Sequence, residues 1–198
     1  MPKGRKTQNS RKFPPEILSE DEIELIFRTF SNRAPTGIRN KALLYVGYRG
    51  GLRLKEALTL FPKDVDTRAG IVNVLYGKGN RSRIVGLPND ACLAIDAWLA
   101  KRARLGFTGR QPLFCSLRGG PIDSSYVRAM MKRLQKRTAI EKRLHYHQLR
   151  HTCAWRMMKK GRDLATIQRM LGHSSLATTS VYLRHVAPLD VIEAMQDP

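Results

Sequence analysis

Residue types that can act on a phosphodiester gather towards the C-terminal end of the chain. His147 and Arg150 form an H-x-x-R motif, and Tyr182 lies nine residues after His173, the histidine of a Leu-Gly-His motif. A guanidinium group can hold a phosphate through its planar set of donors, and a histidine can hold or pass a proton near neutral pH. A tyrosine can be a nucleophile that becomes covalently attached. These residue types predict phosphoryl transfer.

The charge of the chain indicates the class of its partner. Lys and Arg number 36 against 16 acidic residues among 198, which gives a formal net charge of +20. Such an excess predicts a polyanionic partner and binding that weakens with salt. Proteins that bind RNA share this charge, so it indicates nucleic acid as partner and no particular reaction.

Composition places the chain among globular proteins without a membrane segment. Apolar residues make up 42% of the sequence, and no apolar run approaches the roughly 20 residues of a membrane span. The basic N-terminus is followed by no apolar stretch, so we expect no secretory signal. Cys92, Cys115 and Cys153 are odd in number and widely separated. We interpret them as reduced core thiols of a cytoplasmic protein, without a disulfide or metal role.

Residues 1–17 are predicted to form a flexible basic arm, because they carry charge without apolar periodicity and Pro14-Pro15 disfavours a helix. The arm is either a solvated tail or a strap along the DNA backbone. Its candidate DNA-binding residues are Lys3, Arg5, Lys6, Arg11 and Lys12.

Apolar periodicity predicts that the rest of the chain is mostly helical, with helix starts and ends marked by capping residues. Ser19 and Glu22 fit a capping box, and a short helix is expected to hold Arg53, Glu56 and Leu60. The other predicted helices lie at about 38–48, from 89 to near 106, from a cap at Asp123 or Ser124, at 147–160, from Asp163 to Gly172, at 177–183, and at 188–195.

One β-hairpin is predicted among these helices. Residues 71–75 and 84–87 are rich in β-branched side chains, and residues 77–80, Gly-Lys-Gly-Asn, give a turn signal between them. The hairpin would carry Lys78 near its tip. The predicted fold class is therefore mainly α with a small antiparallel β-sheet (α+β).

Taken singly, the candidate residues have simpler explanations. Arg53 and Glu56 could be an i,i+3 ion pair on a helix, and Lys78 could be a solvated hairpin lysine. His147 and His151 share a helix face and could hold zinc. A metalloprotease motif needs a glutamate directly after the first histidine, where this chain has Gln148, so we expect no metal site.

Together the motifs follow one pattern in order. They are G-L-R-L-K-E at 51–56, G-K-G-N-R-S-R at 77–83, H-Q-L-R-H at 147–151, L-G-H-S at 171–174, and Tyr182. This pattern resembles the tyrosine recombinase (phage integrase) family, most closely its Xer-like and bacterial integrase branch, over roughly residues 16–195. The resemblance implies the tyrosine recombinase catalytic-domain fold and a site-specific DNA recombinase or integrase.

The resemblance also implies which residues would hold the scissile phosphate. Arg53 and Arg150 would clamp its non-bridging oxygens and stabilise their charge in the transition state. His173 would donate a further hydrogen bond to that phosphate. Glu56 would orient Arg53 and His147 without touching the DNA.

The strand-cutting step implied by the resemblance uses three further groups. Tyr182 would attack phosphorus and form a 3′-phosphotyrosyl link, Lys78 would protonate the leaving 5′ oxygen, and His147 would assist proton transfer at the tyrosine. The phosphodiester energy stays in the phosphotyrosine, so neither ATP nor a metal is implied. Arg81 and Arg83, in the hairpin motif, are predicted DNA contacts.

Two departures from the family pattern concern the ends of the chain. Most members place a helical core-binding domain before the catalytic one, and residues 1–17 are too few for it. We therefore expect a catalytic domain at 18–198, either a natural single-domain member or an excised domain. Residues 188–195 could pack on a neighbouring subunit, as a tetramer on DNA would require, or on their own domain.

Competing functions stay open from the sequence. A type IB topoisomerase-like activity would use the same chemistry to nick and reseal one strand. A regulator on the same fold, or an RNA binder, would bind nucleic acid without catalysis. The expected partner is double-stranded DNA, with the protein associated with the nucleoid when bound.

Overall fold

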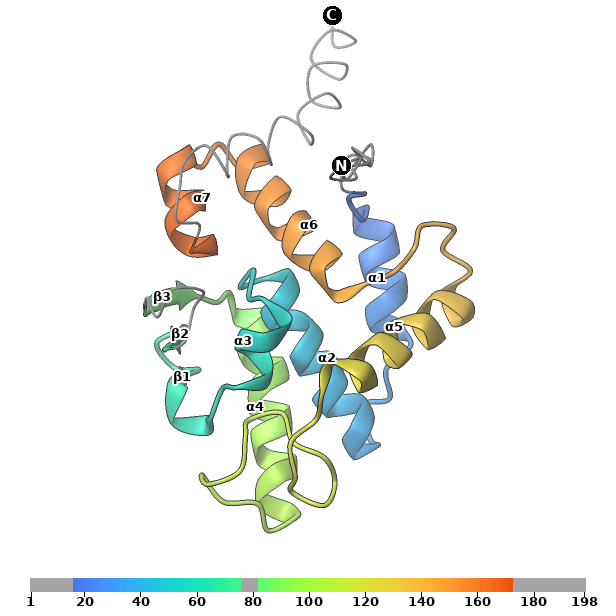
Figure 1. Ribbon diagram of the computed structural model, residues 1–198, viewed down its shortest axis with the longest axis vertical. Coiled ribbons are helices and arrows are strands. Elements are labelled where there is room, and N and C mark those ends of the chain that lie inside the picture. The colour runs from blue at the N-terminus through green and yellow to red at the C-terminus, as the bar shows by residue number, and fades with distance from the viewer. Residues whose placement is uncertain (1–15, 76–81, 173–198) are drawn as a thin grey trace, which may run out of the picture.

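The computed structural model describes residues 16–75 and 82–172 and consists mainly of helices beside one small sheet (Figure 1). This arrangement confirms the predicted fold class. The helices are α1 (Glu20–Arg28), α2 (Pro35–Tyr48), α3 (Leu54–Leu58), α4 (Asn89–Arg104), α5 (Ser124–Thr138), α6 (Tyr146–Lys159) and α7 (Leu164–Leu171). A 3₁₀ turn, η1 (Pro62–Asp64), leads into the strands β1 (Val65–Asp66), β2 (Ile71–Val74) and β3 (Arg83–Gly86).

The sheet has the order β1-β2-β3 with both pairs antiparallel. Val72 lies opposite Val85 in the β2–β3 register, and both are almost fully buried. The predicted hairpin strands are thereby confirmed, whereas its turn lies outside the described residues. Strand β1 was not predicted because two residues are too few to show alternation.

Helix starts follow local capping chemistry. The Ser19 side chain accepts from the Glu22 N–H and Glu22 accepts from the Ser19 N–H, which confirms the capping box. Helix α2 begins at Pro35, earlier than the predicted 38, because proline suits the first helical position. The third helix is shorter than predicted: Arg53 is its N-cap and Leu60 lies beyond its end.

The later helices agree with the predictions to within a few residues. Helix α6 begins at Tyr146 with His145 as its N-cap, one residue before the predicted start. Asp123 and Asp163 cap α5 and α7 through their side chains, as expected. The helices predicted at 177–183 and 188–195 lie outside the described residues.

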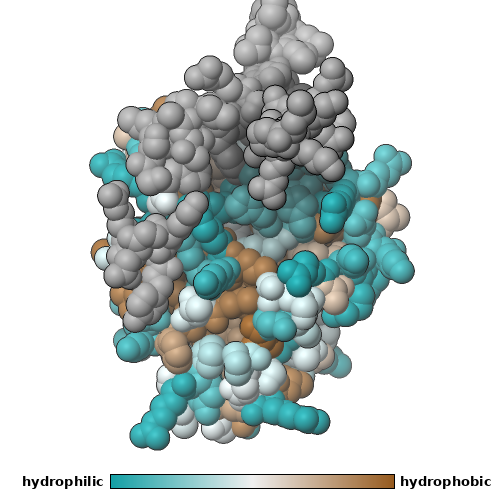
Figure 2. All heavy atoms as spheres, viewed as in Figure 1, coloured by the Kyte–Doolittle hydropathy of each residue, from teal (hydrophilic) through white to brown (hydrophobic). Residues whose placement is uncertain are grey.

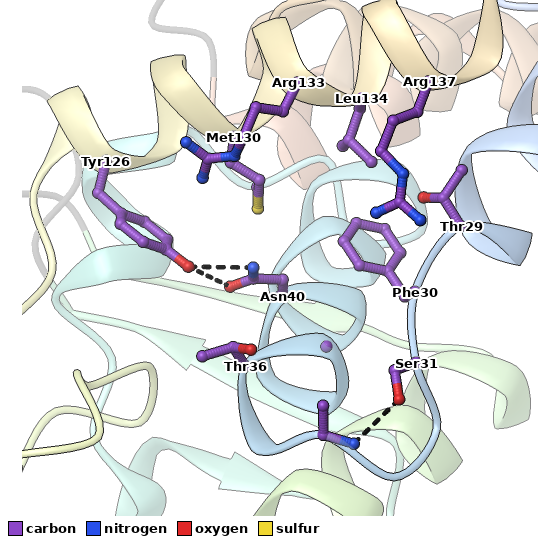
Figure 3. Close-up of a pocket in the computed structure, with 12 residues that line it drawn as sticks. Thr29, Phe30, Ser31, Thr36, Asn40, Tyr126, Met130, Arg133, Leu134 and Arg137 are labelled. Carbon is purple, nitrogen blue, oxygen red and sulfur yellow. Dashed lines mark hydrogen bonds between the residues drawn. The ribbon is translucent and has the colours of Figure 1, made fainter.

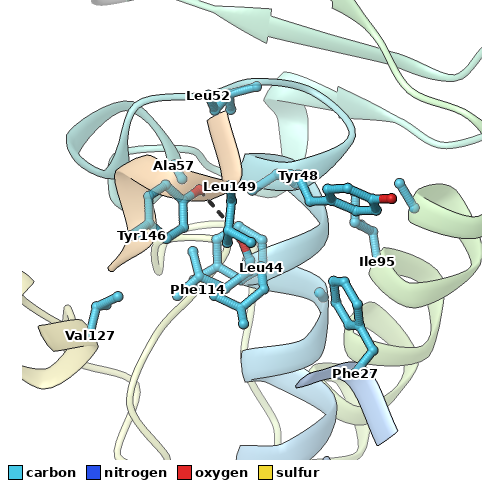
Figure 4. Packing of buried hydrophobic residues seen from close by; sticks show 14 of the residues in the cluster. Phe27, Leu44, Tyr48, Leu52, Ala57, Ile95, Phe114, Val127, Tyr146 and Leu149 are labelled. Carbon is cyan, nitrogen blue, oxygen red and sulfur yellow. Dashed lines mark hydrogen bonds between the residues drawn. The ribbon is translucent and has the colours of Figure 1, made fainter. Parts of the chain in front are cut away.

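The core surrounds α2, which runs through the middle of the molecule and packs against α4 and α6 (Figure 1). Figure 4 shows Leu44 beside Phe114, Tyr146 and Leu149, all nearly or fully buried. The Tyr146 hydroxyl donates to the Leu43 carbonyl at 3.4 Å and so ties the start of α6 to α2. Helix α6, the carrier of the H-x-x-R motif, is thus held by the core at its first turn.

All three cysteines, Cys92, Cys115 and Cys153, are buried and free, which confirms the prediction of core thiols. Burial raises the pKa of the Cys153 thiol to about 12. Its Sγ–H donates to the Arg49 carbonyl. This thiol is therefore a packing group at the α2–α6 contact.

Figure 2 shows hydrophilic residues over much of one face, with hydrophobic residues gathered in the middle of the view. Within residues 16–75 and 82–172, none of the helices combines the length and the apolar character that crossing a membrane requires.

Candidate active site

Three arginines from three separate segments meet at the C-terminal end of α7. Arg83 Nε donates to the Met170 carbonyl at 2.9 Å, and Arg150 Nη2 donates to the Leu171 carbonyl at 2.6 Å. Arg53 Nη2 donates to the next carbonyl, that of Gly172, at 3.1 Å. The last carbonyls of a helix lack helical partners and carry partial negative charge, so they attract cations. The C-terminal end of α7 is thereby bound to α3, β3 and α6.

A single buried carboxylate joins two of these arginines. Glu56, whose side chain is 4% exposed, accepts from the Arg53 backbone N–H and from Arg53 Nη1, each at 2.8 Å. It also accepts from Arg83 Nη1 at 3.0 Å and Nη2 at 2.7 Å. Burial alone would raise the pKa of Glu56, but the bonds from Arg83 and Arg53 and the charge of Arg83 lower it to about 2.

The local charge is positive after this pairing. Three guanidinium groups against one carboxylate leave two positive charges around the end of α7. Arg150 is 1% exposed and also donates from Nη1 to the Gly51 carbonyl. The Arg53 side chain is 27% exposed and that of Arg83 10%. The site therefore presents Arg53 to solvent above two more deeply held arginines.

Two motif glycines permit this close approach. Gly51 has φ +62°, and a Cβ there would lie 2.9 Å from Leu171 Cδ2. Gly172 has φ +63°, and a Cβ there would lie 3.0 to 3.1 Å from Cδ, Cζ and Nε of Arg83. Both positions need glycine for backbone conformation and for space. The G-L-R and L-G-H motifs therefore pack against each other.

His147 is an exposed residue in the first turn of α6. Its ring lies edge-on to the ring of His151, with 4.5 Å between the two ring centroids. Partial removal of the ring from water, together with the positive charges of Arg150, His145 and Arg53, lowers the pKa of His147 to about 4. The imidazole is therefore neutral at physiological pH and can accept a proton. Within the described ranges, no group of three or more His, Cys, Asp or Glu side chains could hold a metal ion.

The structure brings together Arg53, Arg150 and Glu56, as the motif pattern predicted. The expected pairing of Glu56 with Arg53 is present, whereas His147 is not among the hydrogen-bond partners of Glu56 in the described part of the chain. The remaining predicted site residues lie outside the described residues: Lys78, His173, Tyr182, Lys3, Arg5, Lys6, Arg11, Lys12 and Arg81.

Arg83 occupies a place that the sequence analysis missed. It was predicted as a DNA contact, and its guanidinium is instead engaged with Glu56 and with Met170 inside the protein. These partners are 27 and 87 positions away along the chain. No local pattern signals contacts over such separations.

A hollow of about 370 Å³ lies between α5 and the α1–α2 connection. Figure 3 shows Arg137 reaching from α5 towards Thr29 and Phe30, with the Tyr126 hydroxyl hydrogen-bonded to Asn40. The residues that line it do not include the arginines at the end of α7. It is a separate feature of the molecule.

The model of the phage integrase family matches residues 16–188 of this chain. The chain belongs to the phage integrase family. It is 38% identical over 168 residues to tyrosine recombinase XerC of Xylella fastidiosa (strain 9a5c), a match that covers 85% of this chain and 55% of the relative. It is 33% identical over 171 residues to the XerC of Staphylococcus epidermidis (strain ATCC 35984), with 86% and 57% covered.

Solved structures of recombinases have the same fold. The XerA recombinase matches with a TM-score of 0.76 and 33% identity, over 89% of this chain and 65% of that one. The XerH site-specific recombinase bound to palindromic difH substrate, a post-cleavage complex, matches with a TM-score of 0.77 and 28% identity, over 96% and 55%. The expected tyrosine recombinase catalytic-domain fold and Xer-like resemblance are therefore confirmed.

A more distant neighbour has the same fold. The catalytic domain of bacteriophage HP1 integrase shares the fold at a TM-score of 0.63 and 22% identity, over 91% of this chain and 94% of that domain. The chain spans little more than half the length of the curated relatives it matches.

Proposed function

We propose that this chain is the catalytic domain of a site-specific DNA recombinase that cuts and rejoins strands through a 3′-phosphotyrosyl intermediate. The observation that carries the proposal is that Arg53 and Arg150 donate to adjacent carbonyls, those of Gly172 and Leu171. Two guanidinium groups from distant segments thus lie side by side, as two clamps on one phosphate must. Membership of the phage integrase family supports the same function.

The arginines would act on the charge of the scissile phosphate. As the attacking oxygen approaches phosphorus, negative charge on the non-bridging oxygens must be stabilised, and fixed guanidinium donors do so without reorganisation. Glu56 holds Arg53 by two hydrogen bonds and stays ionised because its pKa is about 2. The orientation of Arg53 therefore persists over the whole physiological pH range.

In the proposed step, the Tyr182 oxygen bonds to phosphorus and the bond from phosphorus to the 5′ oxygen breaks. The tyrosine proton passes to an acceptor, a role that we assign to the ring of His147, which is neutral at physiological pH. Lys78 gives a proton to the departing 5′ oxygen, and His173 donates a hydrogen bond to the phosphate. Attack by a 5′-hydroxyl of another strand reverses the step and joins the new strand.

The proposal includes the partner and the assembly. Double-stranded DNA is the expected partner, since the net charge of +20 favours a polyanion and membership of the phage integrase family favours DNA. Residues 1–17 would run along its backbone and add salt-sensitive affinity, and a tetramer would carry out two exchanges on two duplexes. Such a protein would work in the cytoplasm, at the nucleoid.

Covalent trapping tests the proposal without knowledge of the target sequence. The protein is incubated with a library of randomised duplexes, each nicked so that the strand segment released by cleavage diffuses away. The expected result is a protein–DNA adduct that survives denaturation, is absent for Tyr182→Phe, and yields an enriched sequence on recovery. Binding without an adduct would overturn the proposal and favour a regulator.

A second arm separates recombination from nicking and closing. Supercoiled plasmids carrying two copies of the enriched sequence are incubated with the full chain, and the products are resolved by size. Recombinant circles are expected. Relaxed plasmid without recombinants would favour a type IB topoisomerase-like activity.

A further inference from the structure

We propose that Arg83 is a positioning residue of the cleavage site, which locks strand β3, the Glu56–Arg53 pair and the end of α7 into one geometry. This inference rests on the proposed function and assigns to Arg83 a role other than the DNA contact expected from sequence.

The hydrogen bonds of Arg83 span three structural elements. Its Nη1 and Nη2 hold both oxygens of Glu56 on α3, and its Nε holds the Met170 carbonyl on α7. The side chain itself starts from β3. A shift of any one of these elements against the other two would break at least one of the three bonds. Arg83 therefore fixes Arg53 indirectly, through the carboxylate that both arginines share.

Gly172 supplies a second and independent observation. Its missing Cβ leaves the space in which the Arg83 side chain lies, at 3.0 to 3.1 Å from where that atom would be. Gly172 is also the residue whose carbonyl accepts from Arg53, and it directly precedes His173. Arg83 thus packs on the helix end from which the chain continues to a predicted catalytic residue.

A direct DNA contact fits the geometry less well. The Arg83 side chain is 10% exposed, against 27% for Arg53. Turning it towards DNA would leave Glu56, 4% exposed, with Arg53 as its remaining ion-pair partner among the described residues. Removing one partner from a buried ion pair is strongly unfavourable.

Lysine could not replace this arrangement. The three bonds leave from three nitrogens in one rigid plane, whereas a lysine offers a single nitrogen on a flexible stem. Arg83→Lys therefore keeps the charge and loses the geometry. Arg83→Lys therefore distinguishes a role of the charge from a role of the hydrogen-bond geometry.

The first test measures single-turnover cleavage of the enriched duplex at saturating protein by Arg83→Ala and Arg83→Lys. Both variants are expected to cleave roughly 10- to 100-fold more slowly, the effect of a small misplacement of reacting groups, with DNA affinity and its salt dependence unchanged. Arg28→Ala, which removes an arginine that is 75% exposed, is the charge-matched control and should cleave like wild type.

Three outcomes of that test would overturn the inference. Weaker DNA binding with a salt slope reduced by about one, and an unchanged rate at saturation, would mean a phosphate contact. Wild-type cleavage by Arg83→Lys would mean that charge alone matters. A lower melting temperature with an unchanged cleavage rate would mean a purely stabilising role.

A double-variant cycle tests the route through Glu56. If Arg83 acts through that carboxylate, its substitution by alanine should slow cleavage less in a Glu56→Gln background than in the wild type. Equal effects in both backgrounds would contradict this route.

The last readout does not depend on catalysis. In Arg83→Ala the amide of Gly172, which donates to the Arg169 carbonyl at the end of α7, should exchange its hydrogen faster, while amides in the middle of α4 keep the wild-type rate. Unchanged exchange would overturn the inference by itself. If the wild type forms no adduct, the proposed function fails, and this measurement still decides whether Arg83 holds the end of α7.

Discussion

Two regions of the molecule bury arginines against backbone carbonyls, and they differ in what surrounds the guanidinium groups. In the first region Arg102, 2% exposed, donates to carbonyls of the loop that follows α4, and Arg39, also 2% exposed, donates to the carbonyl of Cys115. In the second region Arg53, Arg83 and Arg150 meet at the end of α7.

The first region shows no carboxylate bound to its arginines among the described residues, and burial lowers the pKa of both Arg39 and Arg102. The second holds the ionised Glu56 and leaves Arg53 partly open to solvent. In a chain with 36 lysines and arginines, burial of an arginine therefore does not mark a functional site. The proposed site at the end of α7 rests instead on the convergence of several arginines on one point that opens to solvent.

The largest difference between the regions should appear in cleavage. Arg53→Lys keeps the charge but loses the two-pronged geometry, and we expect the single-turnover rate to fall roughly 100- to 1,000-fold, as for removal of one transition-state donor. The melting temperature should change little because the side chain is partly exposed. Arg28→Lys is the matched control. Equal cleavage by both variants would show that Arg53 has no special role in cleavage.

Arg102→Met should have the opposite profile. The methionine preserves the apolar stem but leaves the carbonyls of Thr108 and Pro112 without this donor. We expect the free energy of unfolding to fall by about 3 kcal/mol, as measured by denaturant titration. The cleavage rate well below the melting temperature should equal that of the wild type, and a selective loss of cleavage would contradict the comparison.

A third variant concerns Gln148, a buried polar side chain outside the proposed catalytic set. Gln148 on α6 is 0% exposed, and its Oε1 and Nε2 have no hydrogen-bond partner within residues 16–75 and 82–172. Gln148→Met should raise the free energy of unfolding by about 1 kcal/mol, since it removes two unsatisfied groups at similar volume. A clear loss of stability would mean that the amide is needed, for example to hold a buried water.

The smallest expected effect is a pH dependence due to His147. Its pKa is lowered to about 4 in the folded protein, below the ordinary 6.5, so the unfolded chain binds more protons between these values. The free energy of unfolding should therefore rise with pH across that window and then level off. In His147→Gln the rise should be shallower, as followed by denaturant titrations at several pH values, and an identical rise would contradict the lowered pKa.

The sequence was sufficient to predict local capping and pairing, and the family that the motifs indicate. Ser19 and Glu22 identified the first helix through a capping box, and the Arg53–Glu56 pair follows from their i,i+3 spacing. The start of α2 at Pro35 was predicted three residues too late, although proline is common at the first helical position.

Contacts between residues far apart in the sequence could not be predicted. The contacts of Arg83 with Glu56 and Met170, and the burial of Arg39 and Arg102, depend on which distant segments pack together. Gly172 shows the same limit. Its position after α7 predicts a helix end, whereas its role in admitting Arg83 appears only in three dimensions.

The most direct test of the central claim compares a normal scissile phosphate with a methylphosphonate, in which a methyl group replaces one charged oxygen. If Arg53 and Arg150 stabilise negative charge on that phosphate, Arg53→Ala and Arg150→Ala should lose far more cleavage on the phosphate than on the uncharged analogue. We predict that the defect of each variant shrinks at least tenfold on the methylphosphonate. An equal defect on both substrates would show that the two guanidinium groups do not act on the charge of the phosphate.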